Sequence, residues 1–254
     1  DVSPFGLEMF DKSTGTFHVY HHDPNDPTSL SSDLIFGVFE DQSGILWVIN
    51  LMESIDKIDR NRPKFSTFKH KPNAKESISG NAVVRVYEDR EKNIWAGPFG
   101  SGLSKLENAS GKWINYLPDP KSPLGMARYV PGIFEDSSGQ FWLGNFGGTL
   151  SLFDRKKGRI IKTYSHDPKN PNSLVKHSQL NQINEDTKSP NYLWLGAYDA
   201  GLVRFNKIDE TFVRYNLTAN QMWMFYQDHD GIIWIPTLGG GLDRFDPENE
   251  KLTN

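Results

Sequence analysis

One short phrase recurs five times along the chain, and it constrains the fold more than any other feature of the sequence. In its fullest form, from Phe134 to Gly144, it reads Phe-Glu-Asp-Ser-Ser-Gly-Gln-Phe-Trp-Leu-Gly. Five of the seven tryptophans are one tryptophan repeated every 40 to 52 residues. A period of this size is the signature of a repeat architecture. The repeated tryptophans are Trp47, Trp95, Trp142, Trp194 and Trp234.

Each repeat divides into four short apolar stretches, bounded by Gly, Asp, Asn or Pro. The first ends in Glu-Asp, as in Val83–Tyr87, and the second carries the tryptophan, as in Phe141–Gly144. The third begins with Gly-Leu, as in Gly201–Phe205, and the fourth ends in an aromatic residue, as in Phe212–Tyr215. Alternating stretches between turn residues predict antiparallel strands. Four such strands per repeat indicate a β-propeller blade.

We therefore predict an all-β chain, a β-propeller of four-stranded antiparallel blades forming a single region over 1–254. One blade cannot bury both of its faces, so each repeated tryptophan is expected to pack between neighbouring blades, where its burial is worth roughly 3 kcal/mol or more. The predicted units are a partial blade at 1–30 and five repeats at about 31–78, 79–124, 125–174, 175–217 and 218–254.

The two ends of the sequence are incomplete repeats. The first unit supplies only a third and a fourth strand, and the last is expected to supply the first three strands and then stop at Asn254. We therefore expect a fragment of a longer array of blades. The sequence leaves open whether the end strands pair with each other, with further blades or domains of the same protein, or with a second copy in a homodimer.

Composition excludes several classes of function. The chain has 28 basic and 32 acidic residues with no basic stripe, which argues against nucleic acid as a partner. No apolar run is long enough to span a bilayer, so no membrane segment is expected in this region. Cysteine is absent, which excludes disulfides and thiolate chemistry but leaves the cellular compartment open.

The extended phrase Glu-Asp-x-x-Gly-x-x-Trp-x-Gly, Gly-Leu-x-x-Phe-Asp and Phe-x-x-Tyr-x-His-Asp-Pro-x-x-Pro-x-Ser-Leu resembles the two-component regulator propeller repeat. That repeat builds the periplasmic sensor region of bacterial hybrid two-component histidine kinases, and the resemblance covers essentially the whole chain. It implies a periplasmic or extracellular domain, the ectodomain of an inner-membrane sensor, that recognises saccharides and signals to a kinase. Local departures are Lys92-Asn93 at one turn, a longer turn at Thr187–Tyr192, and Ser54-Ile55 in place of Gly-Leu. The shared motif transfers no catalytic or ligand residue.

Candidate ligand-binding residues therefore come from positions at which the repeats differ. The loop after the second strand holds Leu51, Phe99, Phe146, Tyr198 and Leu238, each four residues after a repeated tryptophan. Three aromatic residues at one structural position suit stacking against sugar rings, with Asn145 beside them as a polar partner. The alternative is that these residues pack against the adjacent blade.

Polar candidates precede the first strand of each repeat. Asp33, Asn81, Arg128, Ser178 and Asn220 each lie eight residues before the turn aspartate, at the predicted channel mouth. Arg128 could bind a carboxylate or sulfate through two parallel N–H donors, or could simply be solvated. Arg85 lies within a first strand, where it would line the channel and either pair with an acid or face water.

Two further patterns suggest chemistry but are better explained by structure. The His-Asp-Pro copies at His22 and His166 occur once per repeat, so turn chemistry explains them, and no metal or cofactor is expected. The repeated Glu-Asp pairs resemble an acid–base pair, but adjacent strand residues point to opposite faces, and five copies indicate a fold motif. We expect a non-catalytic region. A carbohydrate-active hydrolase or lyase using Glu53 or Asp199, and a protein-interaction or dimerisation propeller, stay open as alternatives.

Overall fold

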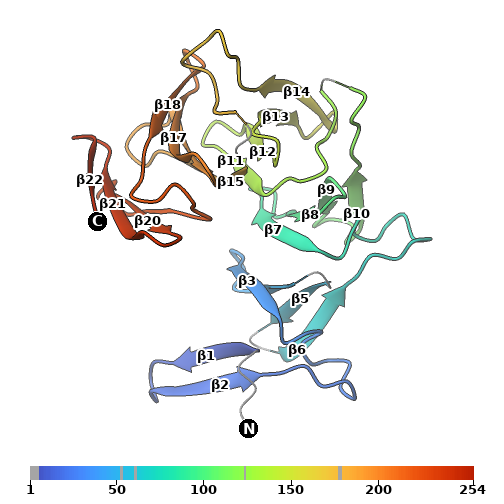
Figure 1. Cartoon of the computed structure of the whole chain (residues 1–254). Helices are drawn as coiled ribbons and strands as arrows, with labels where there is room; N and C mark the ends of the chain where they lie inside the picture. Colours follow the sequence, from blue (N-terminus) through green and yellow to red (C-terminus); the bar gives the residue numbers. More distant parts are fainter. Residues whose placement is uncertain (1–5, 52–53, 60–61, 123, 177–178) are drawn as a thin grey trace. The chain divides into compact units, whose positions relative to one another are not determined.

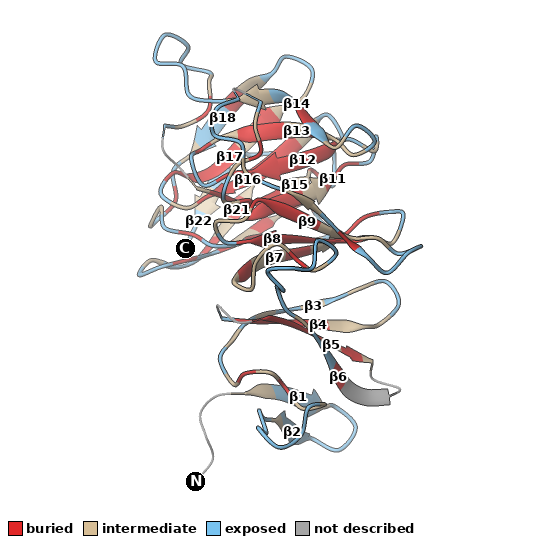
Figure 2. Cartoon of the chain, turned by 90° about the vertical axis from the view of Figure 1, so that its right-hand side faces the viewer, coloured by how far each residue is buried: buried red, intermediate tan, exposed pale blue. Residues whose placement is uncertain are grey.

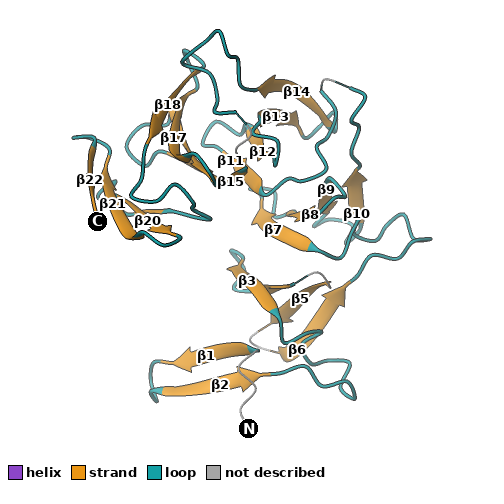
Figure 3. Ribbon diagram, viewed as in Figure 1, coloured by secondary structure: helices purple, strands orange, loops and turns teal. Residues whose placement is uncertain are grey.

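The computed structural model describes the chain except for residues 1–5, 52–53, 60–61, 123 and 177–178. The described part consists of strands, turns and loops without helices, which confirms the all-β prediction (Figure 3). Among the described residues, none forms a helix long and apolar enough to cross a lipid bilayer. The chain divides into two compact units, Asp1–Leu117 and Pro118–Asn254.

The first unit contains a two-stranded sheet and two four-stranded sheets, all antiparallel (Figure 1). The two-stranded sheet, which we call the partial blade, is formed by β1 (Leu7–Asp11) and β2 (Thr16–Tyr20). Blade 1 consists of β3 (Ile35–Glu40), β4 (Leu46–Asn50), β5 (Ser54–Asp59) and β6 (Arg62–Phe68). Blade 2 consists of β7 (Val83–Glu88), β8 (Ile94–Pro98), β9 (Leu103–Leu106) and β10 (Trp113–Tyr116).

The second unit contains three more blades, in which the strands again pair in sequence order. Blade 3 consists of β11 (Gly132–Glu135), β12 (Phe141–Gly144), β13 (Leu150–Asp154) and β14 (Arg159–Tyr164). Blade 4 consists of β15 (Leu180–Glu185), β16 (Tyr192–Ala197), β17 (Gly201–Asn206) and β18 (Thr211–Tyr215). Blade 5 consists of β19 (Tyr226–Gln227), β20 (Ile233–Thr237), β21 (Gly241–Asp246) and β22 (Lys251–Thr253).

The five four-stranded sheets confirm the predicted propeller blades, but the prediction for the last repeat was wrong in one respect. We expected it to end after its third strand, whereas β22 supplies a short fourth strand. Leu252 is the one apolar residue of β22, and it lies opposite Phe245 of β21. A three-residue strand with a single apolar side chain shows no alternation in the sequence, which is why it was missed.

The turn aspartate of each repeat organises the first hairpin of its blade. In blade 3, Asp136 Oδ1 accepts hydrogen bonds from the backbone N–H groups of Ser138 and Gln140, and Gly139 takes the positive φ that the turn requires. The second carboxylate oxygen of Asp136, Oδ2, accepts a hydrogen bond from the indole N–H of Trp142 at 3.0 Å. The aspartate thus ties the turn to the tryptophan. The same indole bond is made by Asp41 to Trp47, Asp89 to Trp95 and Asp228 to Trp234.

Blade 4 departs from this pattern because its turn is longer. The first hairpin loop runs to Tyr192, and the indole N–H of Trp194 is buried without a hydrogen-bond partner. Asp186 instead accepts the backbone N–H of Lys188 and lies 3.8 Å from the guanidinium of Arg204. The insertion therefore removes the aspartate–tryptophan bond while keeping the turn.

The glutamates of two Glu-Asp pairs connect their blade to the previous one. Oε2 of Glu185 in blade 4 accepts the backbone N–H of Ser137, the residue that follows the turn aspartate of blade 3, at 2.9 Å. Glu88 of blade 2 accepts the N–H of Gln42 from blade 1 in the same way, at 2.8 Å. The recurrence of Glu-Asp is thereby explained as a blade-to-blade clamp.

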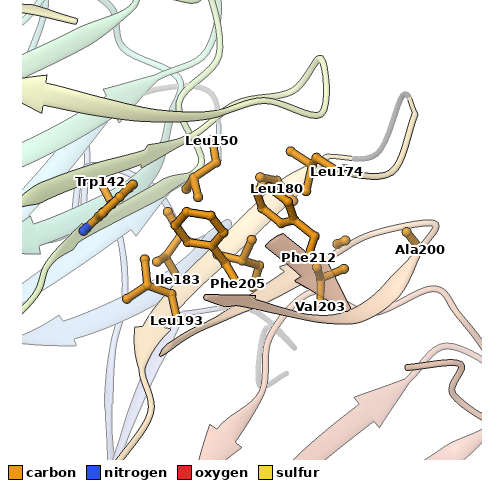
Figure 4. Packing of buried hydrophobic residues seen from close by; sticks show 12 residues of the cluster. Trp142, Leu150, Leu174, Leu180, Ile183, Leu193, Ala200, Val203, Phe205 and Phe212 are labelled. Carbon is orange, nitrogen blue, oxygen red and sulfur yellow. The ribbon is translucent and has the colours of Figure 1, made fainter. Parts of the chain in front are cut away.

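Large apolar side chains fill the junction between neighbouring blades. Trp142 of blade 3 meets Phe205 of blade 4 edge to face, with ring centroids 5.7 Å apart. Figure 4 shows this cluster, in which Trp142 and Leu150 of blade 3 pack with side chains of blade 4 such as Ile183. Trp47, Trp95, Trp142 and Trp194 are buried, and Trp234 of blade 5 is half-buried. The repeated tryptophan therefore occupies a blade-to-blade position in the clusters that contain it.

A lysine completes the junction between blades 3 and 4. Nζ of Lys207 lies 2.8 Å from both Asp136 Oδ2 and Glu185 Oε1, so one ammonium group joins the aspartate of one blade to the glutamate of the next. At the junction between blades 1 and 2, the corresponding residue is Asn108, and a cavity of about 460 Å³ lies there, lined by Asp41, Glu88 and Asn108 among others.

At the junction between blades 4 and 5, both partners of this arrangement are replaced. Gln227 stands in the position of the glutamate, and its Oε1 still accepts a backbone N–H, from Thr187 at 3.0 Å. Pro247 stands in the position of the lysine. The glutamate and the lysine are therefore both absent from this junction, and the uncharged Gln227 makes the backbone bond that the glutamate makes elsewhere.

These junctions predict effects of different size for two substitutions. Lys207→Met should lower the free energy of unfolding by about 3 kcal/mol, because it leaves two largely buried carboxylates without their cation. Asn108→Lys should change it by less than about 1 kcal/mol, because Lys92 already lies 3.9 Å from Glu88 and Lys57 lines the same pocket. Urea unfolding followed by circular dichroism measures both. A stabilising Lys207→Met would contradict this account.

The same ion pairs predict a dependence on pH. Burial by itself raises the pKa of Asp136, but hydrogen bonds from Lys207, Ser138 and Trp142 outweigh it and hold the pKa below its ordinary value. A carboxyl group whose pKa is lower in the folded state than in the unfolded state stabilises the fold at pH values above its unfolded-state pKa. That stabilisation is lost as the pH falls through its folded-state pKa. The difference in stability between the unmodified chain and Lys207→Met should therefore be large near pH 7 and shrink below about pH 4. Urea midpoints measured from pH 3 to 8 test this; a constant difference would contradict it.

Candidate functional site

Aromatic residues gather at one edge of the second unit, where the second strand of each blade turns into the third. Phe146 follows β12 and Tyr198 follows β16. Each turn is hydrogen-bonded to the segment that leads into the next blade, since Asn145 O accepts the N–H of Leu180 and Tyr198 O accepts that of Met222. These backbone bonds hold the turns of blades 3 and 4 at the same edge of the unit.

Each of the two aromatic residues is paired with a ring from a neighbouring loop. Phe146 packs on Tyr129, with centroids 5.1 Å apart, and Tyr198 packs on Trp223 at 4.8 Å. Phe146 and Trp223 are each about half exposed, so each leaves aromatic surface open to solvent. We call Tyr129, Phe146, Tyr198 and Trp223 the aromatic edge.

Charged side chains flank the aromatic edge. Arg128 is exposed and immediately precedes Tyr129, and Asp199 is exposed and immediately follows Tyr198. Asn145 is only 4% exposed, and its Nδ2 donates to the hydroxyls of Thr149 and Ser151 within blade 3. The structure therefore places Arg128 at the edge and Asn145 beneath it.

The other two predicted ligand residues, Phe99 and Arg85, belong to the first unit. Phe99 is half-exposed after β8, at the position equivalent to Phe146. Arg85 lies in β7 opposite Gly97; its Nε is buried without a hydrogen-bond partner, and burial lowers the pKa of its guanidinium. At the equivalent position of blade 4, the amide of Gln182 bonds to both the N–H and the C=O of Phe225 in the next blade.

Three members of the predicted ring of polar residues before the first strands cap loops, whereas Arg128 is exposed. Asp33 accepts the backbone N–H of His22 at 2.6 Å, and Asn81 accepts that of His70. Asn220 accepts the N–H of Leu217 at 3.1 Å. Ser178 lies outside the described residues, as does Glu53, one of the two carboxylates suggested for catalysis.

The repeated histidines close the crossover loops. In three crossovers, Nδ1 of the histidine lies within hydrogen-bond distance of the backbone carbonyl eight residues later, as predicted by turn chemistry. The pairs are His22 with Leu30, His70 with Ile78, and His166 with Leu174. Within the described ranges, no group of three potential metal ligands occurs.

The repeated carboxylates are engaged in structural bonds. Both oxygens of Glu135 accept from the guanidinium of Arg155, at 2.7 and 3.1 Å, and Glu185 is held by Lys207 and Ser137. Asp199, the other carboxylate suggested for catalysis, stands exposed in its turn.

Sequence reasoning missed half of the aromatic edge. Tyr129 and Trp223 lie in the segments leading into blades 3 and 5, where the repeats share no motif. A signal was available for Trp223, because it is one of only two tryptophans outside the repeated phrase. The other, Trp113, is a buried fourth-strand residue. An exposed tryptophan that the repeat does not require is a candidate binding residue.

Comparison with known proteins identifies the fold. No protein-family model matches the sequence, and the curated proteins contain no match. Among solved structures, the extracellular domain of a protein described as a hybrid two-component system, BT3049 from B. thetaiotaomicron, has a TM-score of 0.74 at 22% identity. The alignment covers 89% of this chain and 30% of that one.

Two further solved structures show the same relationship. The extracellular domain of a protein described as a one-component system, BT4673 from B. thetaiotaomicron, has a TM-score of 0.65 at 19% identity, covering 98% of this chain and 40% of that one. PorZ, a surface component of the type-IX secretion system of Porphyromonas gingivalis, has a TM-score of 0.70 at 13% identity, covering 93% and 35%. This chain thus spans 30 to 40% of the length of these structures. It shares the β-propeller fold of these structures, two of which are extracellular domains of proteins described as one-component or hybrid two-component systems, as the repeat phrase predicted.

Proposed function

We propose that this chain is the ligand-sensing propeller region of an extracytoplasmic sensor in a two-component signalling system, and that its ligand is an oligosaccharide bound on the aromatic edge. The observation that carries the proposal is the pair of half-exposed ring contacts, Phe146 on Tyr129 and Trp223 on Tyr198. The structural neighbours described as extracellular domains of one-component and hybrid two-component systems support the location and the sensory role.

The chemistry of the edge favours a sugar over a purely apolar ligand. A pyranose ring presents C–H groups on its faces and hydroxyl groups around its rim, so it pairs with an aromatic face flanked by polar groups. Phe146 supplies such a face on blade 3, and Trp223 supplies one where it packs on Tyr198 of blade 4, while Asp199 and Arg128 supply an acceptor and donors beside them. Two separated rings fit an extended oligosaccharide better than a single monosaccharide.

The corresponding proposal for the chemistry is that the chain binds the oligosaccharide without cleaving it. Glycoside cleavage uses two carboxyl groups on either side of one bond, about 5 to 9.5 Å apart. The repeated glutamates and aspartates are used in turn and junction bonds, which supports a sensor that transmits occupancy to the rest of the receptor. A histidine kinase in the complete protein would be the recipient of that signal.

A thermal-shift screen tests sugar binding. An oligosaccharide that binds only the folded chain, at 100 times its dissociation constant, should stabilise it by about 2.7 kcal/mol. Trp223→Ala and Phe146→Ala should each abolish most of the shift. The matched control is Ile208→Ala, which truncates an exposed apolar residue in the turn between β17 and β18, at the opposite edge of the unit. If no neutral or acidic glycan shifts the chain, or if Ile208→Ala has the same effect, this proposal fails.

Arg128 predicts which glycans bind best. Its guanidinium can hold a carboxylate or sulfate through two N–H donors, so uronic-acid or sulfated oligosaccharides should bind more tightly than neutral ones of equal length. Arg128→Ala should remove this preference, at a cost of about tenfold in affinity for acidic glycans, and leave neutral glycans unchanged. Calorimetric titration at two salt concentrations measures both. Equal losses for acidic and neutral glycans would contradict this role.

A further inference from the structure

In four of the five blades, a polar residue of the third strand bonds to a polar residue at the fourth strand. In blade 1, Thr67 of β6 donates its hydroxyl to Asp56 Oδ1 of β5 at 2.8 Å. Asp56 Oδ2 also accepts the backbone N–H of Ser31, in the crossover loop that leads into the blade, at 2.8 Å. The polar pair of blade 1 therefore ties the crossover loop to the outer strands of its own blade. The other pairs are Ser104 with Asn115, Ser151 with Thr163, and Asp243 with Asn254.

Blade 4 departs from this arrangement at all three positions. Val203 of β17 stands in the place of the third-strand residue and lies opposite Arg214 of β18. In the crossover loop, Val175 stands in the place of Ser31, since each directly follows the leucine that ends the Ser-Leu motif. A pocket of about 370 Å³ lies here, and the three replaced positions all line it. Blade 4 thus has a pocket at the place where blade 1 has a polar network.

The floor of this pocket, which we call the crossover pocket, is apolar. Leu174, Val203 and Phe212 line it and are buried, and Val175 beside them is half-buried. β17 below it is mostly buried, whereas β18 is mostly exposed or half-buried (Figure 2). A hydrocarbon group placed against this floor is removed from water, which is favourable in proportion to the apolar area that it buries.

The rim of the crossover pocket carries positive charge. The exposed side chains of Arg214 and Lys176 both line it. Nε of Arg214 donates to the backbone carbonyl of Ala200 at 2.7 Å, which fixes the guanidinium at the pocket and leaves its two Nη groups as a parallel pair of donors. Asp167, the acidic residue of the lining, accepts the backbone N–H of Lys169 within its own turn at 2.9 Å. The rim therefore offers two cations to a ligand and one carboxylate that already caps a turn.

We propose that the crossover pocket binds a small organic monocarboxylate. Its carboxylate accepts hydrogen bonds from the two Nη groups of Arg214, with Lys176 beside it, and its hydrocarbon part lies against the apolar floor. A single negative charge fits this rim better than a phosphate dianion, because Asp167 also lines the pocket and repels added negative charge. The pocket shares no residue with the aromatic edge, so this inference does not rest on oligosaccharide binding.

Hexanoate is the probe, and a saturation-transfer NMR titration of the chain measures its binding. A ligand of this size that uses both the floor and the rim should bind with a dissociation constant of about 1 mM, so the titration should extend to about 10 mM. Acetate, which lacks most of the hydrocarbon part, and hexanamide, which lacks the charge, should each bind at least about tenfold more weakly. Equal binding of hexanoate and hexanamide, or no saturable binding of hexanoate, would overturn the proposal.

Single substitutions locate the bound hexanoate. Arg214→Gln should weaken its binding about tenfold, because the paired donors are lost. The matched control is Arg159→Gln, which removes an exposed arginine of β14 that does not line the pocket and should leave binding unchanged. Trp223→Ala, which removes part of the aromatic edge, should also leave it unchanged. Unaltered binding in Arg214→Gln would overturn the assignment, as would an equal loss in Arg159→Gln or Trp223→Ala.

A double substitution replaces the pocket by the polar pair of another blade. Val203→Ser combined with Arg214→Thr gives blade 4 the residues that blade 3 has in Ser151 and Thr163, which are paired in the same register. The chain should therefore stay folded by circular dichroism and lose hexanoate binding. A folded double variant that binds hexanoate as tightly as the unmodified chain would show that the ligand lies elsewhere.

Discussion

The packing of blade 3 against blade 4 depends on one buried carboxylate. In blade 3, Asp136 holds its own turn and its own tryptophan, and it also binds Lys207 of the next blade. Ser137 beside it donates its backbone N–H to Glu185 of that blade. Local turn formation, orientation of the main junction side chain and blade-to-blade contact thus share two adjacent residues. A blade can fold its hairpin only in the conformation that also presents the clamp to its neighbour.

This coupling explains why the fold could be predicted from the sequence and the binding surface only in part. The spacing of the turn aspartate and the tryptophan is fixed by a bond that recurs in four of the five blades, so it appears as a repeated phrase. Leu252 in β22 and Tyr129 before β11 obey no such constraint, because a short outer strand and a loop can hold many sequences. Asn145 shows that a position next to a candidate binding residue in the sequence need not lie on the same surface. It is next to Phe146 in sequence, yet the two side chains leave the chain on opposite sides, one into the blade and one to the surface.

The apolar surfaces exposed on this chain have different physical meanings. Phe146 and Trp223 rest on other aromatic rings, which hold their exposed faces in place. Phe10 and Val38 lie at positions that are buried in the other blades, so their exposure reflects an uncovered blade face. Comparison with equivalent residues in the same chain therefore distinguishes rings that rest on other rings from positions that a neighbouring blade covers elsewhere.

The junctions between blades differ in a way that bears on how such chains change over time. Between blades 3 and 4 the glutamate and the lysine occur together, and between blades 4 and 5 Gln227 and Pro247 replace both. The glutamate and the lysine of one junction, Glu185 and Lys207, belong to the same repeat. The aspartate that the lysine binds, Asp136, belongs to the repeat before it. A duplication or exchange of one whole blade therefore moves the residues that this blade contributes to the junctions on both of its sides, and these residues then face different neighbours. The turn aspartate itself recurs in all five repeats, so an exchanged blade meets an equivalent carboxylate and keeps its own glutamate and lysine together, whereas a cut through the middle of the sheet of blade 4 would separate Glu185 from Lys207.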